Sequence, residues 1–222
     1  MGFGQLPYDV AHLLGGGMLL LSFMLLYQRR VGAVVNVLAA QGAVLAMAAA
    51  WQGLVQGAPQ LYLTALVAAA AKAALIPMAL RWMIRRLALA RGVDAALGIG
   101  PSLVAGVALV ALAIMVALPI TTGAQALARE DLAIALSVVL LGMLMMITRR
   151  NAILQVVGLM SLENGLVLAA VGVAGMPLVV ELSTAALVML VLVVAGVVVF
   201  QMRERLDSLD TLLLHPHRGE RE

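Results

Sequence analysis

The sequence contains no cysteine, few aromatic residues (3 Phe, 2 Trp and 3 Tyr) and few charged ones. The absence of cysteine excludes disulfides, thiolate zinc sites and iron–sulfur ligation within this chain. Charged residues make up 11% of the 222 residues and hydrophobic residues 64%, whereas soluble domains carry about 25% and about 45–50%. We therefore expect an integral membrane protein. Its abundance of small and aliphatic residues favours packed helices over a barrel.

Recognisable catalytic motifs are also missing. The sequence has no phosphate-binding glycine loop, no nucleophile elbow and no acid–base pair in a soluble cleft. We therefore expect no catalytic, metal or cofactor site in this chain, and the chemistry that remains is the movement of charge.

Apolar runs of bilayer length predict seven transmembrane helices with short polar or glycine-containing connections. The expected helices span residues 8–27, 31–52, 60–86, 97–118, 130–148, 151–174 and 177–202. The predicted fold class is therefore an all-α, integral membrane helical bundle.

The arginines indicate the orientation of the bundle, and they explain a sequence pI near 10.0 without any nucleic-acid partner. With the N-terminus outside and the C-terminus cytoplasmic, only Arg129 is left outside. The cytoplasmic set is then Arg29, Arg30, Arg85, Arg86, Arg91, Arg149, Arg150, Arg203 and Arg205, with Arg218 and Arg221 in the tail. The sequence therefore predicts a multi-pass protein of the cytoplasmic (inner) membrane of a prokaryote.

The domain organisation is simple. Residues 1–202 form one transmembrane domain, and residues 203–222 form a cytoplasmic tail with leucines at amphipathic spacing. Arginine pairs and prolines at matching places suggest a repeat of residues 8–86 by residues 130–202. Arginines that simply mark cytoplasmic helix ends explain the same pattern.

Two opposite charges lie deep in apolar runs. Glu163 lies roughly 20 Å along its helix from Arg150, and a carboxylate at that depth costs on the order of 2.5–3.5 kcal/mol. Lys72 lies roughly 18–20 Å from either end of its helix, too deep for its side chain to reach a headgroup. We expect the two to face a common hydrated interior, paired directly or through water. Glu163 is then the candidate proton carrier and Lys72 its charge partner, and a purely structural ion pair is the alternative.

Other polar residues are candidate extensions of this path. Asn164 follows Glu163, and Gln41 and Asn36 share the second helix. Glu181 lies only about 6 Å into the last helix and is expected near the outer interface. Interhelical hydrogen bonding is the alternative role for the amides.

Several residues are expected to shape helices. Pro77 should bend its helix by removing the bond to the Ala73 carbonyl. Gly158, Gly165 and Gly172 repeat every seven residues and predict a close-packing face.

Three polar residues near the outer helix ends are expected to have ordinary roles. His12 should be a hydrogen-bonded interfacial histidine, and Glu130 and Asp131 should be first-turn acids that complement a helix dipole.

Two segments resemble a known family. TRRNAILQVVGLMSLENG, which holds Glu163, and LTALVAAAAKAALIPMAL, which holds Lys72 and Pro77, are similar to stretches of the hydrogenase-4 component E family. The second half of the chain also resembles two small three-helix proteins, subunit K of complex I and its counterpart in multi-subunit sodium/proton antiporters. These share the arginine-pair opening, the pair Gly158-Leu159 and an intramembrane carboxylate.

This resemblance implies a non-catalytic membrane subunit of a complex-I-like respiratory or hydrogenase complex. Its expected partners are other membrane subunits, including antiporter-like ones, with iron–sulfur or nickel–iron centres in the partner subunits. The chain departs from the patterns at Met160, where subunit K has its first glutamate, and at Leu187 and Val191, which replace acidic residues of the last helix.

Two other functions fit the same sequence. The chain could be a scaffold subunit without a proton path of its own, or a free-standing secondary transporter. The expected function is a part of an intramembrane proton path coupled to redox chemistry in partner subunits.

Overall fold

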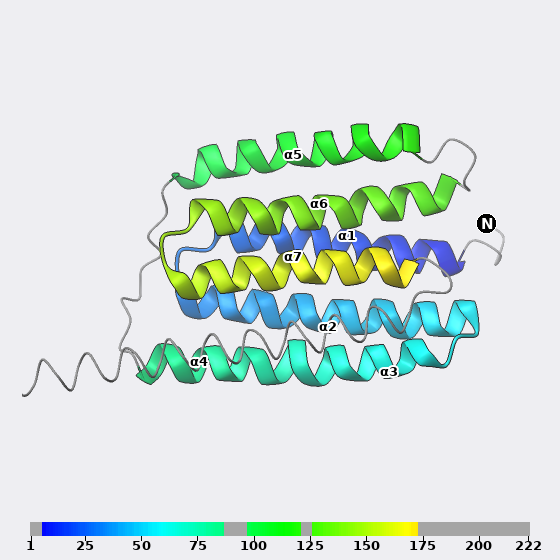
Figure 1. The fold of residues 1–222 in the computed structure, drawn as a ribbon, viewed down its shortest axis with the longest axis horizontal. Helices are drawn as coiled ribbons and strands as arrows, with labels where there is room; N and C mark the ends of the chain where they lie inside the picture. Colours follow the sequence, from blue (N-terminus) through cyan, green and yellow to red (C-terminus); the bar gives the residue numbers. More distant parts are fainter. Residues whose placement is uncertain (1–5, 87–96, 121–125, 173–222) are drawn as a thin grey trace, which may run out of the picture. The chain divides into compact units, whose positions relative to one another are not determined.

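The computed structural model describes residues 6–86, 97–120 and 126–172, which form helices and short connections (Figure 1). The third span is one continuous rod in which a π-helical segment, η1, joins two α-helices. The elements are α1 (Leu6–Tyr27), α2 (Val31–Gln56), α3 (Gln60–Val67), η1 (Ala68–Leu75), α4 (Ile76–Arg86), α5 (Ile99–Ile120), α6 (Ala126–Thr148) and α7 (Ala152–Gly172).

Six helices in the described residues, counting α3–η1–α4 as one, are long and apolar enough to cross a membrane. They match the first six helices expected from the sequence to within a few residues, so the all-α, multi-pass prediction is confirmed to that extent. The expected seventh helix (177–202), with Glu181, and the tail (203–222) lie outside the described residues.

Four helices form the centre of the described bundle. α6 packs along α7, α1 packs along α2, and each pair contacts the other through α1–α6 and α2–α7. α5 lies outside α6, and the α3–η1–α4 rod lies against α2 (Figure 1). A residue on the inner face of α2 or α7 is therefore enclosed by several helices.

α2 runs four residues beyond the end expected at residue 52. It stops at Gly57, which has φ 63° and whose N–H bonds to the Gly53 carbonyl. Glycine adopts this left-handed conformation without the steric cost of a Cβ, which is why the helix ends there. Pro59 then precedes α3.

The connection between α6 and α7 uses its polar residues as caps. Asn151 Oδ1 accepts a hydrogen bond from the Ile153 N–H at 2.9 Å, which caps the start of α7. The Arg149 side chain is buried and donates from Nη2 to the carbonyl of Leu26 at 2.6 Å, at the end of α1. Burial also lowers the pKa of the Arg149 guanidinium below its ordinary value. Arg149 therefore binds the carboxyl end of a neighbouring helix, in addition to any effect on topology.

Glycines let α6 and α7 approach until their backbones touch. A Cβ at Gly158 would lie 2.9 Å from the Met146 nitrogen, and a Cβ at Gly165 would lie 2.8 Å from the Val139 nitrogen. The predicted close-packing role is confirmed for both. For Gly172, a Cβ would meet no described residue within 4 Å, and the residues that follow it lie outside the described part of the chain, so its role stays a prediction.

The π-helical segment changes the effect expected of Pro77. Bonds in η1 reach back five residues, as when the Ile76 N–H bonds to the Ala71 carbonyl. Pro77 follows directly, as the second residue of α4, and has no N–H to offer a carbonyl of this turn. The irregular segment therefore includes Lys72 itself.

Candidate functional site

Lys72 and Glu163 form a direct ion pair in the middle of the bundle. Lys72 Nζ lies 2.8 Å from Glu163 Oε1, and each side chain is only 3% exposed. Glu163 is about 14–17 Å from either end of α7, and Lys72 is about as deep in its rod. The two charges that the sequence placed at similar depth are in contact.

A chain of amides and hydroxyls extends from this pair. Lys72 Nζ donates to Asn164 Oδ1 at 3.0 Å, and Asn164 Nδ2 donates to Gln41 Oε1 at 3.3 Å. Gln41 Nε2 in turn donates to the hydroxyls of Ser22, at 2.9 Å, and Ser161, at 3.1 Å. We call these residues the polar cluster: Ser22, Gln41, Lys72, Ser161, Glu163 and Asn164.

The polar cluster joins α1, α2, η1 and α7, and every member is at most 3% exposed. Each amide in the chain presents its oxygen toward Lys72 and its nitrogen away from it. The Lys72 ammonium is therefore stabilised by the amide dipoles as well as by the Glu163 carboxylate.

Glu163 is less completely bonded than Lys72. Its Oε2 is buried and has no hydrogen-bond partner among the residues that the structure describes. A buried carboxylate oxygen of this kind is costly as an anion and can accept a proton. Chemically, the site can bind a proton on Glu163, lose one from Lys72 and transfer one between them.

Close packing of α2 fixes the position of the Lys72 backbone. A Cβ on Gly42, next to Gln41 on α2, would lie 2.7 Å from the carbonyl carbon of Lys72 and 2.8 Å from its oxygen. Only glycine allows α2 to approach η1 this closely. The helices that carry Gln41 and Lys72 are thus fixed against each other at the polar cluster.

Asn36 lies outside the polar cluster, although the sequence made it a candidate for the path. Its Oδ1 accepts a hydrogen bond from Arg81 Nη2 at 2.8 Å, in an exposed pair between α2 and α4. Glu181 is outside the described residues, so its place in the path stays a prediction.

Ser22 and Ser161 are the members that sequence reasoning missed. Serine is common on transmembrane helices, where its hydroxyl can bond to the backbone of its own helix, as Ser22 Oγ does with the Met18 carbonyl at 2.9 Å. For Ser161, the sequence offered one indication of membership in the polar cluster: it lies two residues before Glu163 and three before Asn164.

His12 and Asp131 form a second polar contact, at the end of the bundle opposite Arg149. His12 Nδ1 lies 3.0 Å from Asp131 Oδ1, and both side chains are about one third exposed. The hydrogen-bonded histidine is confirmed. The first-turn position of Asp131 is wrong, because α6 begins at Ala126 and Asp131 falls in its second turn.

No group of three or more His, Asp or Glu side chains gathers as a metal site among the described residues. The polar cluster holds one cation, one anion and neutral donors and acceptors. This composition suits protons better than a bound metal ion.

A curated protein of Mycobacterium tuberculosis, the uncharacterized protein Rv0085, is similar to this chain. The two are 28% identical over 204 residues, which cover 88% of this chain and 90% of that protein. No family model matches the chain, and no solved structure matches it.

Proposed function

We propose that this chain is a non-catalytic membrane subunit of a complex-I-like respiratory or hydrogenase complex, and that it carries part of an intramembrane proton path. The observation that carries the proposal is the buried Lys72–Glu163 pair at 2.8 Å with its chain of amides and hydroxyls. The resemblance of the same two segments to the hydrogenase-4 component E family supports the choice of complex.

A proton can cross this site and leave the pair electrically neutral at the end of the cycle. A proton that binds Glu163 forms the neutral acid and leaves the Lys72 ammonium without a counter-charge. Loss of a proton from Lys72 restores neutrality, and transfer of the remaining proton across 2.8 Å from Glu163 to Lys72 regenerates the ion pair. One proton has then crossed the pair, and Asn164 Oδ1, which accepts from Lys72 Nζ, stabilises the ammonium while Glu163 is neutral.

The proposed setting is the cytoplasmic membrane of a prokaryote, with seven spans, the N-terminus outside and the C-terminus in the cytoplasm. The distribution of arginines supports this orientation. Redox chemistry belongs to iron–sulfur or nickel–iron centres of partner subunits, because this chain has no cysteine to ligate a cluster. Antiporter-like subunits are the proposed neighbours along the membrane.

The test is the substitution Glu163→Gln in the intact complex, with proton uptake by vesicles and electron transfer measured together. Glutamine keeps the size and polarity of the side chain but does not bind a proton at neutral pH. We expect pumping to be lost or strongly reduced while electron transfer and assembly persist. Asn36→Ala, which removes a polar side chain of α2 outside the polar cluster, should leave pumping unchanged. Normal pumping in Glu163→Gln would remove the carrier role.

A scaffold function is the second candidate, because α6 and α7 touch through their backbones at Gly158 and Gly165 and a buried ion pair can serve only to fix helix register. The double substitution Lys72→Met/Glu163→Leu distinguishes the two functions. A scaffold would keep its complex pumping normally with this apolar pair, whereas a proton path would stop.

A further inference from the structure

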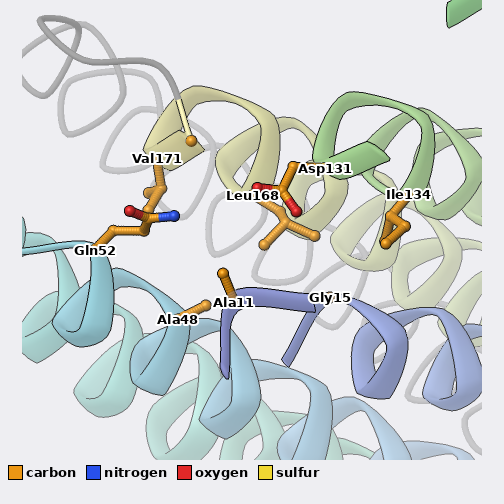
Figure 2. Close-up of a pocket in the computed structure, with 9 residues that line it drawn as sticks. Ala11, Gly15, Ala48, Gln52, Asp131, Ile134, Leu168 and Val171 are labelled. Carbon is orange, nitrogen blue, oxygen red and sulfur yellow. The ribbon is translucent and has the colours of Figure 1, made fainter. Parts of the chain in front are cut away.

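A pocket lies between the four central helices, at the end of the bundle that carries the His12–Asp131 contact (Figure 2). Each helix contributes to its lining: Gly15 from α1, Ala48 and Gln52 from α2, Asp131 and Ile134 from α6, and Leu168 from α7. Figure 2 shows Gln52 and Asp131 as the polar side chains on this lining. The pocket thus combines a carboxylate and an amide with otherwise small or aliphatic walls.

The pocket and the polar cluster lie on the same face of α1. Gly15 lines the pocket, Met18 follows three residues later, and Ser22 of the polar cluster follows four residues after that. Residues three, four and seven apart share one face of a helix. Along α1, one side chain therefore separates the pocket from the polar cluster.

The same spacing recurs on α2 in the opposite chain direction. Ala48 lines the pocket, Leu45 lies one turn deeper, and Gln41 of the polar cluster lies one turn deeper again. On α7, Leu168 of the pocket is one turn from Asn164. Along these three helices, the pocket lies about 6–10 Å from the polar cluster.

A single apolar layer closes this route. Met18, Leu45 and Val138 belong to one contiguous hydrophobic cluster, and each has 0% of its surface exposed. We call these three residues the apolar seal. A layer one turn thick excludes water from the polar cluster, yet the rotation of one flexible methionine or leucine side chain would open it.

We propose that this pocket is the outer vestibule of the proton path. In it, Asp131 exchanges a proton with water, and the proton crosses the apolar seal between Asp131 and Glu163. This inference rests on the proposed function and identifies the outer opening of the proton path. Asp131 binds the proton as the neutral acid. When a side chain of the apolar seal rotates, water enters and carries the proton to the Glu163 carboxylate, so one O–H bond breaks at Asp131 and one forms at Glu163. His12, in contact with Asp131 at 3.0 Å, is the neighbouring group that orients its carboxylate.

Accessibility of single cysteines tests the vestibule without any transport assay. The chain has no native cysteine, so Ala48→Cys, Leu45→Cys and Ser161→Cys can be introduced one at a time into the intact complex. Silver ions, which are small monovalent cations that bind thiols, are added to membranes, and the thiols left free are then tagged after denaturation. We expect silver to protect Ala48→Cys at least about tenfold faster than the two deeper cysteines, because these react only when the structure opens. Equal rates at the three positions would overturn the proposal.

Removal of one seal residue should open the route. In the Ser161→Cys background, Leu45→Ala should raise the rate of silver protection at least about tenfold, because the truncated side chain leaves space for water between pocket and cluster. Leu38→Ala is the matched control, since Leu38 is a buried leucine one turn from Gln41 on the other side from the pocket. An equal increase in both variants would contradict the seal.

Transport measurements then test the role of Asp131. Asp131→Asn should reduce proton pumping several-fold per electron transferred, because asparagine cannot bind the proton. The matched control is Asp9→Asn, which changes an exposed aspartate at the same end of the bundle. If Asp131→Asn pumps normally although Ala48→Cys reacts with silver, the pocket is a hydrated dead end and the proposal fails. This outcome is separate from normal pumping by Glu163→Gln, which would refute the proposed function itself.

Discussion

Two buried cations, Lys72 and Arg149, are stabilised by different kinds of partner. Lys72 is paired with a carboxylate at 2.8 Å in the middle of the bundle. Arg149 lies at the end of the bundle, where Nη2 donates to the backbone carbonyl of Leu26 at 2.6 Å. Both are less than 5% exposed, so burial alone does not distinguish them.

The difference lies in what each partner can do. The carbonyls at the end of α1 carry a fixed partial negative charge that cannot bind a proton at ordinary pH. A carboxylate can bind and release a proton, so the charge beside Lys72 can change. A guanidinium also keeps its proton much more strongly than an ammonium does. The Arg149 contact is therefore suited to anchoring helices, and the Lys72 contact to moving charge.

The largest expected effect on stability comes from breaking the Lys72–Glu163 pair on one side only. Lys72→Met leaves the Glu163 carboxylate buried without its cation, which should lower the free energy of unfolding by about 3–5 kcal/mol. Denaturant titration in mixed micelles measures this change. The double variant Lys72→Met/Glu163→Leu is the control and should recover most of the loss, because no charge is then left unpaired. A double variant as unstable as the single one would mean that Lys72 stabilises the fold through other contacts.

Removal of the Arg149 anchor should have the next largest effect. Arg149→Leu loses the charged hydrogen bonds to the end of α1 and should cost about 1.5–3 kcal/mol in the free energy of unfolding. Its exposed neighbour gives a matched control, and Arg150→Leu should change stability by less than about 0.5 kcal/mol. Pumping per assembled complex should stay normal in Arg149→Leu. A specific loss of pumping there would erase the distinction between the two cations.

The smallest effect should follow from adding one methyl group beside Lys72. In Gly42→Ala the new Cβ would meet the backbone of Lys72 at 2.7 Å, and overpacking of this kind costs about 1–3 kcal/mol. We expect the same variant to reduce pumping, because α2 and η1 must separate and Gln41 moves with α2. Gly32→Ala, whose Cβ would meet none of the described residues within 4 Å, should leave both stability and pumping unchanged. Tolerance of Gly42→Ala would show that the position of η1 is not critical.

The depth of a charge could be read from the chain, but its neighbours could not. Lys72 and Glu163 stood out because each lies far from both ends of an apolar run. Asn36 and Gln41 looked alike, since both are amides on one helix. Only the direction of each side chain separates Asn36, bonded to Arg81, from Gln41, which links Ser22 and Asn164. That direction depends on which helices pack against α2.

Local backbone detail also escaped the sequence. Pro77 predicted an irregularity, but its register depends on the five-residue bonds of η1, which form where α2 packs against the rod at Gly42. Arg149 was explained by topology alone, because nothing in the sequence places the end of α1 beside the connection between α6 and α7.

The sequence by itself determined that the chain is a bundle of membrane-spanning helices, because the length and hydrophobicity of each run are local properties that a bilayer reads directly. It also determined that two opposite charges lie far from water. Only the tertiary structure decided that the charges touch, that three hydroxyl and amide groups beyond Asn164 complete the polar cluster, and that one apolar layer separates it from a pocket. Those facts depend on which helical faces meet. In an apolar chain, alternative arrangements of the helices differ only in how their side chains pack, which the sequence does not display.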